Sequence, residues 1–496
     1  MKKLSYKTLA EVSYKGYLLP DAPERILQFG EGNFLRGFVN HFVDVLNEQT
    51  CFNSKVVTVQ PIAQGLSEMI NDQEGLYTLY LRGYKDGEKV NEKRVISNIS
   101  RCLNPYTQYD EVLACADNPE LRIITSNTTE AGIQFDPSCE LTDDPPSSFP
   151  AKLTQFMYRR FQSFGAHKGK GFILLACELI DDNGKELESC VLRYARHWKL
   201  EDTFITWIQE ENVFCSTLVD RIVTGYPRQE AHILCEELGY HDQLLDTAEI
   251  FGLWVIEGPE WIKEVFPVDM TKLPIVITHD HKPYKARKVR ILNGAHTTFV
   301  LAAYLAGQNI VRDCMEDEVI LRFMKKTIFD EIIPTLDLAY EELVEFAESV
   351  IDRFKNPFID HELLSIALNS TSKWRARVLP SLKQYVARTG DIPQCICVSF
   401  ASYIAFYQGV ELTEHGLKAY RGDEVYYIKD DQPVLEFFAS MKDKTEEELV
   451  ASVIRETSFW GEDLSAIPEF EANVLQALKH IKEYGAYSLM QDATIN

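Results

Sequence analysis

Residues 26–46, ILQFGEGNFLRGFVNHFVDVL, carry the strongest fold signal in the chain. A short apolar run leads into Gly30-Glu31-Gly32, and the apolar residues that follow recur at helical spacing. Gly30 permits a tight turn, Gly32 leaves room for backbone to approach a pyrophosphate, and the start of the helix offers unpaired N–H groups to an anion. The stretch therefore predicts a strand, a phosphate-binding turn and a helix.

The glycine pattern leaves the nature of its ligand open. Gly37 follows at a spacing of G-x-G-x4-G, and a strand-to-helix turn that binds no nucleotide has the same local pattern. The second predicted strand ends at Val59-Gln60-Pro61, which offers neither a carboxylate for an adenosine ribose nor an arginine for a 2′-phosphate. This strand end therefore does not decide between NAD and NADP.

Outward from this stretch, short apolar runs alternate with helical segments as far as about residue 280. This alternation is typical of a doubly wound α/β sheet. Residues 77–84 and 93–99, joined around the Asp86-Gly87 turn, predict a hairpin that decorates the sheet. The predicted strands are 25–30, 55–60, 122–125 and 172–177, and the predicted helices between them are 109–116, 152–164 and 185–198.

The pattern changes near residue 284, after which most apolar segments have helical spacing. Thr445 and Glu448 form a capping box before one of these segments. We therefore expect an α/β sheet domain at 1–283, a mostly α-helical domain at 284–496, and a ligand site where the two meet. The predicted helices of the second domain are 288–305, 316–332, 340–354, 363–369 and 446–456.

Composition excludes several classes of protein. The 496-residue chain has a formal net charge of −24, which argues against binding to nucleic acid or to an anionic membrane surface. No segment resembles a signal peptide or a transmembrane helix, and the 11 scattered cysteines predict free thiols in a reducing cytoplasm. Cys395 and Cys397 form a close pair, which predicts a buried apolar segment rather than a metal site.

A second informative stretch, residues 281–307, contains Lys288, Asn293 and His296. On an α-helix Asn293 lies about 140° and His296 about 80° from Lys288, so all three can edge one pocket. In ketone reduction a lysine ammonium can protonate the developing alkoxide, and an asparagine N–H can stabilise the oxygen. A histidine can hold a neighbouring hydroxyl, so the three side chains together suit carbonyl reduction.

Other interpretations of this region stay open. Polar residues at the start of a helix are also typical of a solvated surface. His279 and His281 can lie on one strand face, but a lone H-x-H lacks the three or four ligands that a zinc site takes. We therefore expect no metal and assign the histidine pair to the domain junction.

Taken together, these segments resemble the polyol-specific long-chain dehydrogenases, the mannitol dehydrogenase family. The K-x4-N-G-x-H element at residues 288–296 is its most specific part, and the turn QFGEGNFLRGF resembles the members that reduce hexuronates. The resemblance runs along nearly the whole chain. Its further segments are 126–133 (SNTTEAGI), Cys177-Glu178, Asn183-Gly184, 218–222 (LVDRI), 254–257 (WVIE), Asn356-Pro357 and Ser372-Lys373.

The resemblance implies a Rossmann-type first domain with NAD as cofactor, and a metal-independent interconversion of D-tagaturonate and D-altronate. It makes Lys288 the general acid/base, Asn293 an oxyanion partner and His296 a substrate-orienting group, with Lys373 at the substrate. We also expect Lys285 at the substrate, as a cation that this chain has in addition to the family pattern. We expect a cytoplasmic monomer or weak homo-oligomer that acts on a small sugar acid. The residues expected at the cofactor are Ile26, Gln28, Phe29, Gly30, Glu31, Gly32, Asn33, Phe34, Leu35, Arg36, Gly37, Asn127 and Thr128.

Two positions depart from the family pattern. Leu179 stands where many members have a second oxyanion asparagine, and Lys285 replaces an acidic residue; an added cation fits a carboxylate-bearing substrate. Within the same chemistry, a fructuronate reductase or a mannitol-type polyol dehydrogenase is the alternative. A protein that senses NAD(H) without turnover is another, although it would not need Lys288, Asn293 and His296.

Overall fold

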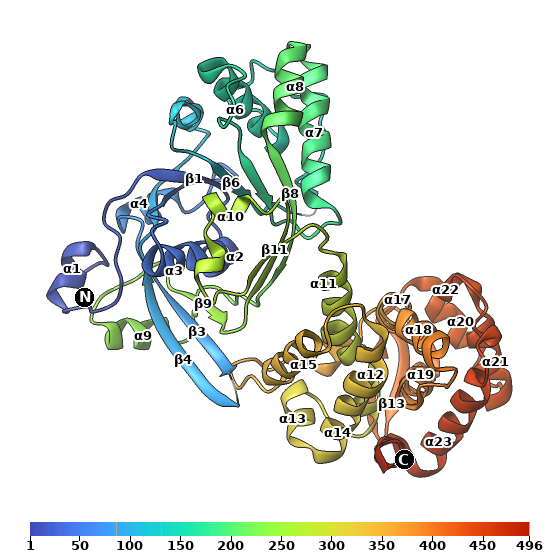
Figure 1. Cartoon of the computed structure of the whole chain (residues 1–496). Coiled ribbons are helices and arrows are strands. Elements are labelled where there is room, and N and C mark those ends of the chain that lie inside the picture. Colours follow the sequence, from blue (N-terminus) through green and yellow to red (C-terminus); the bar gives the residue numbers. More distant parts are fainter. Residues whose placement is uncertain (86, 130, 496) are drawn as a thin grey trace. The chain divides into compact units, whose positions relative to one another are not determined.

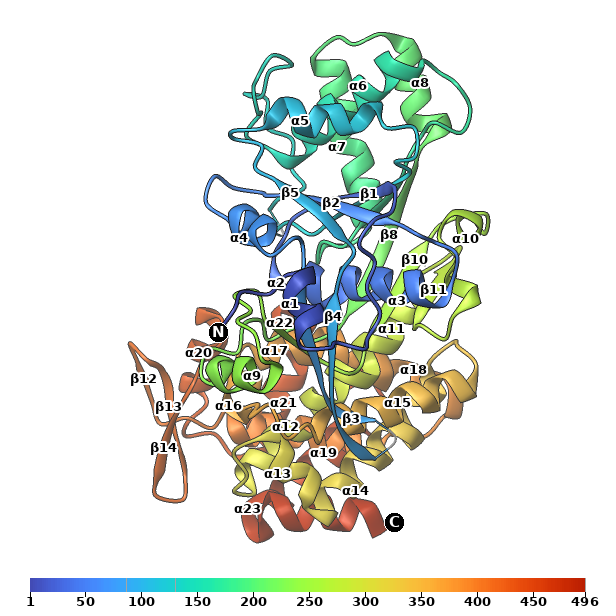
Figure 2. The same cartoon turned by 90° about the vertical axis from the view of Figure 1, so that its left-hand side faces the viewer.

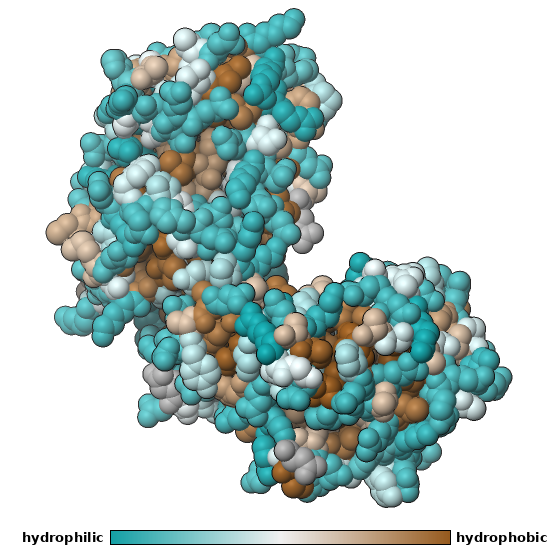
Figure 3. Space-filling model, turned by 45° about the vertical axis from the view of Figure 1, so that its right-hand side comes forward, coloured by the Kyte–Doolittle hydropathy of each residue, from teal (hydrophilic) through white to brown (hydrophobic). Residues whose placement is uncertain are grey.

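The computed structural model describes residues 1–85, 87–129 and 131–495, so Asp86 of the expected hairpin turn and Glu130 of the segment 126–133 lie outside the described residues. The chain divides into two compact units, residues 1–82 with 90–281 and residues 83–89 with 282–496. Hydrophilic side chains cover most of the face that Figure 3 presents. In the described part of the chain, none of the helices combines the length and apolarity needed to cross a bilayer.

The main sheet of the first unit has the strand order β11-β10-β8-β7-β6-β1-β2-β5. From β5 to β8 all neighbours are parallel, and their order is the 3-2-1-4-5-6 of a Rossmann fold. The order reverses between β1 and β6, where such sheets bind ligands. The strands are β1 (Glu24–Phe29), β2 (Lys55–Val59), β5 (Ile99–Leu103), β6 (Ile123–Ser126), β7 (Ile173–Ala176), β8 (Val213–Asp220), β10 (Leu253–Glu257) and β11 (Ile275–Thr278).

Helices cover both faces of this sheet, which confirms the predicted doubly wound architecture (Figure 1). Side chains alternate along β1: Leu27 and Phe29 pack against the layer of α5 to α8, and Ile26 packs against the layer of α2 and α3. The helices of this unit are α1 (Tyr6–Glu11), α2 (Asn33–Leu35), η1 (Arg36–Asn40), α3 (His41–Gln49), α4 (Ser67–Asp72), α5 (Tyr109–Ala114), η2 (Cys115–Asp117), α6 (Phe149–Phe164), α7 (Asn183–His197), α8 (Asp202–Glu211), α9 (Ala231–Leu238), α10 (Ile262–Val265) and η3 (Val268–Met270).

The expected hairpin is present as β3 (Tyr77–Lys85) and β4 (Glu88–Ile96), but it does not decorate the main sheet. Instead, β3 pairs in parallel with β9 (Asp246–Glu249) in a separate sheet of order β4-β3-β9. Leu79 lies opposite Asp246 in this pairing, more than 160 residues away along the chain. A pairing over such a distance leaves no local pattern in the sequence, and the prediction of its location was therefore wrong.

The second unit is mostly helical, as predicted. Its helix α19 (Gln394–Phe406) is almost entirely buried, and Cys395 and Cys397 lie in its core as expected. The helices are α11 (Lys282–Arg287), η4 (Lys288–Asn293), α12 (Gly294–Leu305), α13 (Val311–Glu316), α14 (Glu318–Lys326), η5 (Thr327–Ile332), η6 (Ile333–Thr335), α15 (Tyr340–Phe354), α16 (Leu363–Ile366), α17 (Ser370–Arg377), α18 (Leu379–Thr389), α20 (Gln432–Ser440), α21 (Glu446–Arg455), α22 (Thr457–Trp460), η7 (Leu464–Ala466) and α23 (Phe470–Ile495).

Two details of this unit bear on the predictions. The capping box of Thr445 and Glu448 is present at the start of α21, with both reciprocal hydrogen bonds. A small antiparallel sheet of β12 (Glu411–Thr413), β13 (Gly416–Arg421) and β14 (Glu424–Ile428) was not predicted (Figure 2). The strands β12 and β13 lack the apolar runs by which the other strands were recognised, whereas the run VYYI of β14 was overlooked.

Candidate functional site

The turn after β1 is tight at its first glycine and open at its second. Gly30 has φ +117°, and a Cβ there would lie 2.7 Å from Leu35 Cδ1. Gly32 has φ −66°, and a Cβ there would have no heavy atom within 4 Å. Gly30 is therefore required by the fold itself, whereas the space in front of Gly32 is free for a ligand.

Buried polar side chains hold this turn in place. Gln28 Nε2 donates to the carbonyl oxygen of Gly30 at 2.9 Å. Arg36 is 2% exposed, and its guanidinium donates to the carbonyl oxygens of Glu31 at 3.2 Å and Leu244 at 2.6 Å. Arg36 Nη2 also donates to Asn33 Oδ1 at 2.6 Å, so each of its three guanidinium nitrogens bonds to the protein. We therefore assign Arg36 to the support of the turn rather than to a phosphate contact.

Across the switch point, the segments after β6 and β7 are tied together. Asn127 Nδ2 donates to the carbonyl oxygen of Cys177 at 2.8 Å, and the backbone N–H of Thr128 donates to Glu178 Oε1 at 3.0 Å. Glu178 is buried, burial raises its pKa, and its Oε2 has no hydrogen-bond partner among the described residues. The neighbouring Leu179 is 69% exposed, at the position where many family members were expected to have asparagine.

Only part of the expected cofactor set reaches the surface. Gly32 and Asn33 are exposed, and Phe34, Asn127 and Thr128 are half-buried. The open approach to Gly32, the helix that begins at Asn33 and the position at the switch point all fit a dinucleotide. The buried remainder forms the support of the turn and consists of Ile26, Gln28, Phe29, Gly30, Glu31, Leu35, Arg36 and Gly37.

The end of β2 adds no nucleotide ligand to this set. Gln60 is 1% exposed, and its Nε2 donates to the carbonyl oxygens of Ile62 at 2.7 Å and Ala63 at 3.0 Å. Its Oε1 accepts from the backbone N–H of Ser67 at 3.1 Å. Gln60 thus shapes the loop after β2, and the choice between NAD and NADP is not decided there.

The lysine–asparagine segment has a different geometry from the one expected. Lys288 and Asn293 are the first and last residues of η4, which is π-helical rather than α-helical. A π-helix bonds residue i to residue i+5, so residues five apart lie one turn apart on the same face. The predicted separation of about 140° between Lys288 and Asn293 was therefore wrong, and the correction brings the two side chains onto one face.

His296 follows one turn later, on α12. Its ring stacks on Phe354 with centroids 4.0 Å apart and meets the ring of His361 edge-on at 5.5 Å. Burial, and then the neighbouring His361 and Arg353, lower the pKa of His296 well below its usual value. Its Nε2 is buried and has no hydrogen-bond partner among the described residues, so a neutral imidazole remains available to a hydroxyl.

Helix α17 brings further cations to the same place. A Cβ at Gly294 would lie 3.3 Å from the carbonyl oxygen of Arg377, so this glycine allows the end of α17 to pack closely. Arg377 Nη1 lies 3.5 Å from Thr297 Oγ1, and Lys373 Nζ donates to the carbonyl oxygen of Ile366 at 2.8 Å. Burial, and then the charge of Arg377, lower the pKa of Lys373.

Some of these residues were missed by the sequence analysis. Arg377 lies four residues after Lys373, the spacing of neighbours on one helix face, and this spacing was the only signal for it. His361 comes from a loop and had no signal. Lys285 lies on α11 and, like Lys288, is half-buried.

One histidine of the pair at 279 and 281 contacts a carboxylate that is also paired with a lysine. His281 Nδ1 lies 2.5 Å from Glu257 Oε2, and Lys185 Nζ lies 3.2 Å from Glu257 Oε1. His281 is also the last residue of the first unit. Within the described residues, no group of three or more His, Cys, Asp and Glu side chains is arranged to hold a metal ion.

Comparisons with known proteins match both units. A family model described as the mannitol dehydrogenase Rossmann domain matches residues 24–267, and one described as the mannitol dehydrogenase C-terminal domain matches residues 280–482. An altronate oxidoreductase of Pectobacterium carotovorum is 47% identical over 472 residues, covering 93% of this chain and 95% of the relative. One from Cronobacter sakazakii is 46% identical over 486 residues, covering 97% and 98%.

Solved structures agree with the fold. A substrate-free D-sorbitol dehydrogenase has a TM-score of 0.78 and 21% identity, covering 99% of this chain and 100% of the other. A mannitol 2-dehydrogenase of Pseudomonas fluorescens, solved as a ternary complex with NAD and D-mannitol, has a TM-score of 0.64 and 21% identity, with 99% of each chain covered. At this identity the likeness establishes the fold alone.

Proposed function

We propose that this chain, which belongs to the mannitol dehydrogenase family and is a dehydrogenase, interconverts D-tagaturonate and D-altronate with NAD(H). The observation that carries the proposal is the π-helical segment η4, which places Lys288 and Asn293 on one face, with His296 a turn further on. The name shared by the relatives that are 46–47% identical to this chain supports the substrate pair.

The first unit holds the cofactor in this proposal. The backbone of Gly32 and Asn33 at the start of the helix receives the pyrophosphate, and Asn127 and Thr128 lie on the other side of the switch point. NADH, when bound, supplies a hydride to the carbonyl carbon of the keto-sugar acid. The buried residues Gln28 and Arg36 act only by keeping the turn in shape.

The second unit supplies the proton. In the reducing direction the ammonium of Lys288 donates a proton to the carbonyl oxygen of the substrate, and the side-chain N–H of Asn293 donates a hydrogen bond to the same oxygen. In the oxidising direction the neutral amine of Lys288 takes the proton from the hydroxyl. The neutral imidazole of His296 orients a neighbouring hydroxyl of the substrate through its unpaired Nε2.

The cations around His296 suit a substrate with a carboxylate. Lys373 and Arg377 approach it from α17, and their mutual repulsion contributes to the lowered pKa of Lys373. A bound carboxylate would relieve that repulsion, whereas the uncharged ketose fructose would leave it in place. This arrangement favours a hexuronate over a mannitol-type polyol.

A substrate panel tests the proposal. The initial rates of NADH and NADPH oxidation are measured with D-tagaturonate, D-fructuronate and D-fructose. We expect the highest kcat/KM with D-tagaturonate and NADH. A higher kcat/KM with D-fructuronate or D-fructose would contradict the proposal in favour of the corresponding alternative. Binding of NADH without oxidation of any of the three would support a sensor instead.

A substitution of Lys285 tests whether the protein recognises the carboxylate of its substrate. Its replacement in Lys285→Glu reverses a charge on α11, one turn before Lys288. We expect KM for D-tagaturonate to rise more than KM for an uncharged ketose, because only the uronate loses an attractive charge and meets a repulsive one. Equal increases for both substrates, measured by steady-state kinetics, would contradict this role.

We also propose that the protein works in the cytoplasm as a monomer or weak homo-oligomer on a small sugar acid. All eleven cysteines are free, and all except Cys51 are buried, which is the usual state in a reducing compartment. Size-exclusion chromatography with light scattering over a range of concentrations measures the oligomeric state.

A further inference from the structure

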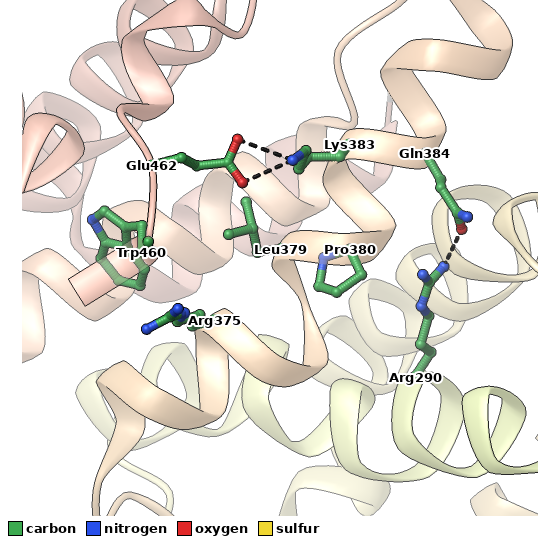
Figure 4. A pocket seen from close by; sticks show the side chains of 9 residues that line it. Arg290, Arg375, Leu379, Pro380, Lys383, Gln384, Trp460 and Glu462 are labelled. Atoms are coloured by element: carbon green, nitrogen blue, oxygen red, sulfur yellow. Dashed lines mark hydrogen bonds and ion pairs between the residues drawn. The ribbon is translucent and has the colours of Figure 1, made fainter. Parts of the chain in front are cut away.

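The second unit has a pocket of about 460 Å³ between η4, α17, α18 and the turn after α22 (Figure 4). This volume is large enough for a small metabolite. Leu379, Pro380 and Trp460 contribute apolar surface to its lining. The charged residues of the lining are Arg290, Arg375, Lys383 and Glu462.

The lining is cationic in a strongly acidic protein. It carries three basic side chains against one carboxylate, although the chain as a whole has a formal net charge of −24. The protein as a whole carries an excess of negative charge, which repels anions, whereas the pocket carries an excess of positive charge. The pocket is therefore suited to an anionic ligand. An excess of two positive charges suits a dianion.

The three cations have different partners. Lys383 Nζ pairs with Glu462 at 2.7 Å, on side chains that are each about half exposed. Arg290 Nη1 donates to Thr335 Oγ1 at 3.1 Å and to Gln384. Arg375 is exposed and makes no hydrogen bond or ion pair with any described residue (Figure 4). Its donors are therefore available to a ligand.

The backbone beside Arg375 is shaped to admit its guanidinium. Gly461 has φ +80°, and a Cβ there would lie 2.6 Å from Arg375 Nη2. A side chain at this position would both strain the turn and push the guanidinium away. The glycine thus keeps Arg375 close to Trp460 and within the pocket.

This pocket is separate from the substrate residues of the same helix. Lys373 and Arg377 are four residues apart on α17 and share a face, with His296 and Thr297 nearby. Arg375 lies two residues from each, roughly 160–200° around the helix. Helix α17 therefore presents cations on two opposite sides, and the proposed function uses only one of them.

We propose that this pocket binds a small phosphate monoester, with its phosphate between Arg375 and Lys383. The planar guanidinium matches two phosphate oxygens, and the ammonium supplies a point charge. The phosphate takes the place of Glu462 at Lys383, and the apolar lining packs against the organic part. The proposal does not depend on which sugar acid the enzyme reduces.

Thermal unfolding of the full-length protein tests the proposal. Saturating NADH is present throughout to fill the cofactor site, and sodium chloride keeps the ionic strength constant. Inorganic phosphate and glucose 6-phosphate are the probes, and a ligand of the native state raises Tm with its concentration. We expect both to raise Tm, glucose 6-phosphate at the lower concentration.

Matched variants locate the binding. The double variant Arg375→Gln/Lys383→Gln is expected to bind glucose 6-phosphate at least about tenfold more weakly, because it loses charge-assisted hydrogen bonds. Glu462→Gln removes the competing carboxylate and is expected to bind several-fold more tightly, an effect that misfolding would not mimic. Lys373→Gln, which alters the substrate face, and Lys442→Gln, at an exposed lysine, are expected to respond like the wild type.

Each possible result of these titrations either supports or overturns the proposal. A response that is lost in Arg375→Gln/Lys383→Gln and strengthened in Glu462→Gln supports the pocket. A response that survives unchanged in the double variant, or that disappears in Lys373→Gln, overturns the proposal. Absence of any response of the wild type to glucose 6-phosphate also overturns it.

Discussion

At the scale of single residues, the two glycines of the turn after β1 have different tasks. Gly30 has a left-handed φ and no room for a Cβ, whereas Gly32 has an ordinary φ and open space before it. A substitution at each position therefore separates the stability of the turn from its affinity for the cofactor.

We predict that Gly30→Ala destabilises the protein by about 1–2 kcal/mol or more, because an alanine is strained at positive φ and meets Leu35. Gly32→Ala should leave stability unchanged but weaken NADH binding, because its methyl group projects toward the proposed pyrophosphate. Chemical denaturation and titration of NADH fluorescence measure the two effects. Unchanged NADH affinity in Gly32→Ala would contradict the assignment of the turn.

The neutral state of His296 has a consequence for stability against pH. Its folded-state pKa is well below the ordinary value, so the unfolded chain binds a proton that the native protein does not. The contribution of His296 to the free energy of unfolding therefore has its full value above the ordinary histidine pKa and is lost as the pH falls below about 6.5.

We predict that His296→Gln makes the protein less sensitive to acid between about pH 6.5 and pH 5. The measurement is the urea midpoint of the unfolding transition at pH 7.5 and pH 5.5 for both proteins, with the difference between the two pH values compared. His279→Gln, at a histidine that is not packed in this cluster, is the control. An identical pH dependence in His296→Gln and the wild type would show that folding does not lower the pKa of His296.

At the scale of elements, the buried helix α19 depends on a single carboxylate. Its N-cap is Pro393, which gives no side-chain cap. Instead, Glu331 accepts from the backbone N–H groups of Cys395 at 2.7 Å and Ile396 at 2.9 Å. Burial raises the pKa of Glu331 to about 7, so ionising its carboxyl costs stability, and the contribution of this residue to the free energy of unfolding falls as the pH rises from about 4.3 towards 7.

We predict that Glu331→Ala lowers the stability of the second unit by about 2–4 kcal/mol at pH 5.5, below the raised pKa of Glu331, because two buried N–H groups lose their acceptors. Glu331→Gln keeps one carbonyl acceptor and should cost less. Unfolding followed by circular dichroism measures the loss. A loss within experimental error for Glu331→Ala would show that α19 needs no such cap.

Local patterns made most elements predictable, and long-range or irregular features were missed. The strands β1, β2, β6 and β7 were recognised from short apolar runs, and the start of α21 from its capping box. The pairing of β3 with β9 depends on residues far apart in the chain. The π-helical form of η4 could not be predicted from its sequence, because the apolar spacings of an α-helix and a π-helix cannot be distinguished over so short a segment.

The candidate site shows the same division. The glycine turn and the element of Lys288, Asn293 and His296 are continuous in sequence and were found. His361 contacts His296 from a loop that is distant in sequence, and Glu178 belongs to the candidate site because it is buried and accepts a hydrogen bond from Thr128. Neither residue could be recognised without the fold.

At the scale of the whole molecule, the proposed function divides the work of one reaction between the two units. The first unit is a Rossmann sheet whose switch point carries the turn proposed to bind NAD(H), and the second is a helical unit whose π-helical segment carries Lys288, the proposed acid/base. Neither unit holds both groups, so the proposed chemistry needs the intact chain. The central claim is that Lys288 moves the proton while the first unit alone determines the affinity for NADH.

The most direct test compares the wild type with Lys288→Ala, using Lys442→Ala as the control at an exposed lysine of the same unit. NADH oxidation with D-tagaturonate and the dissociation constant of NADH are measured for each protein. The account predicts that kcat of Lys288→Ala falls by about 100- to 10,000-fold with the affinity for NADH unchanged, and that Lys442→Ala behaves like the wild type. Turnover within tenfold of the wild type in Lys288→Ala would contradict the account.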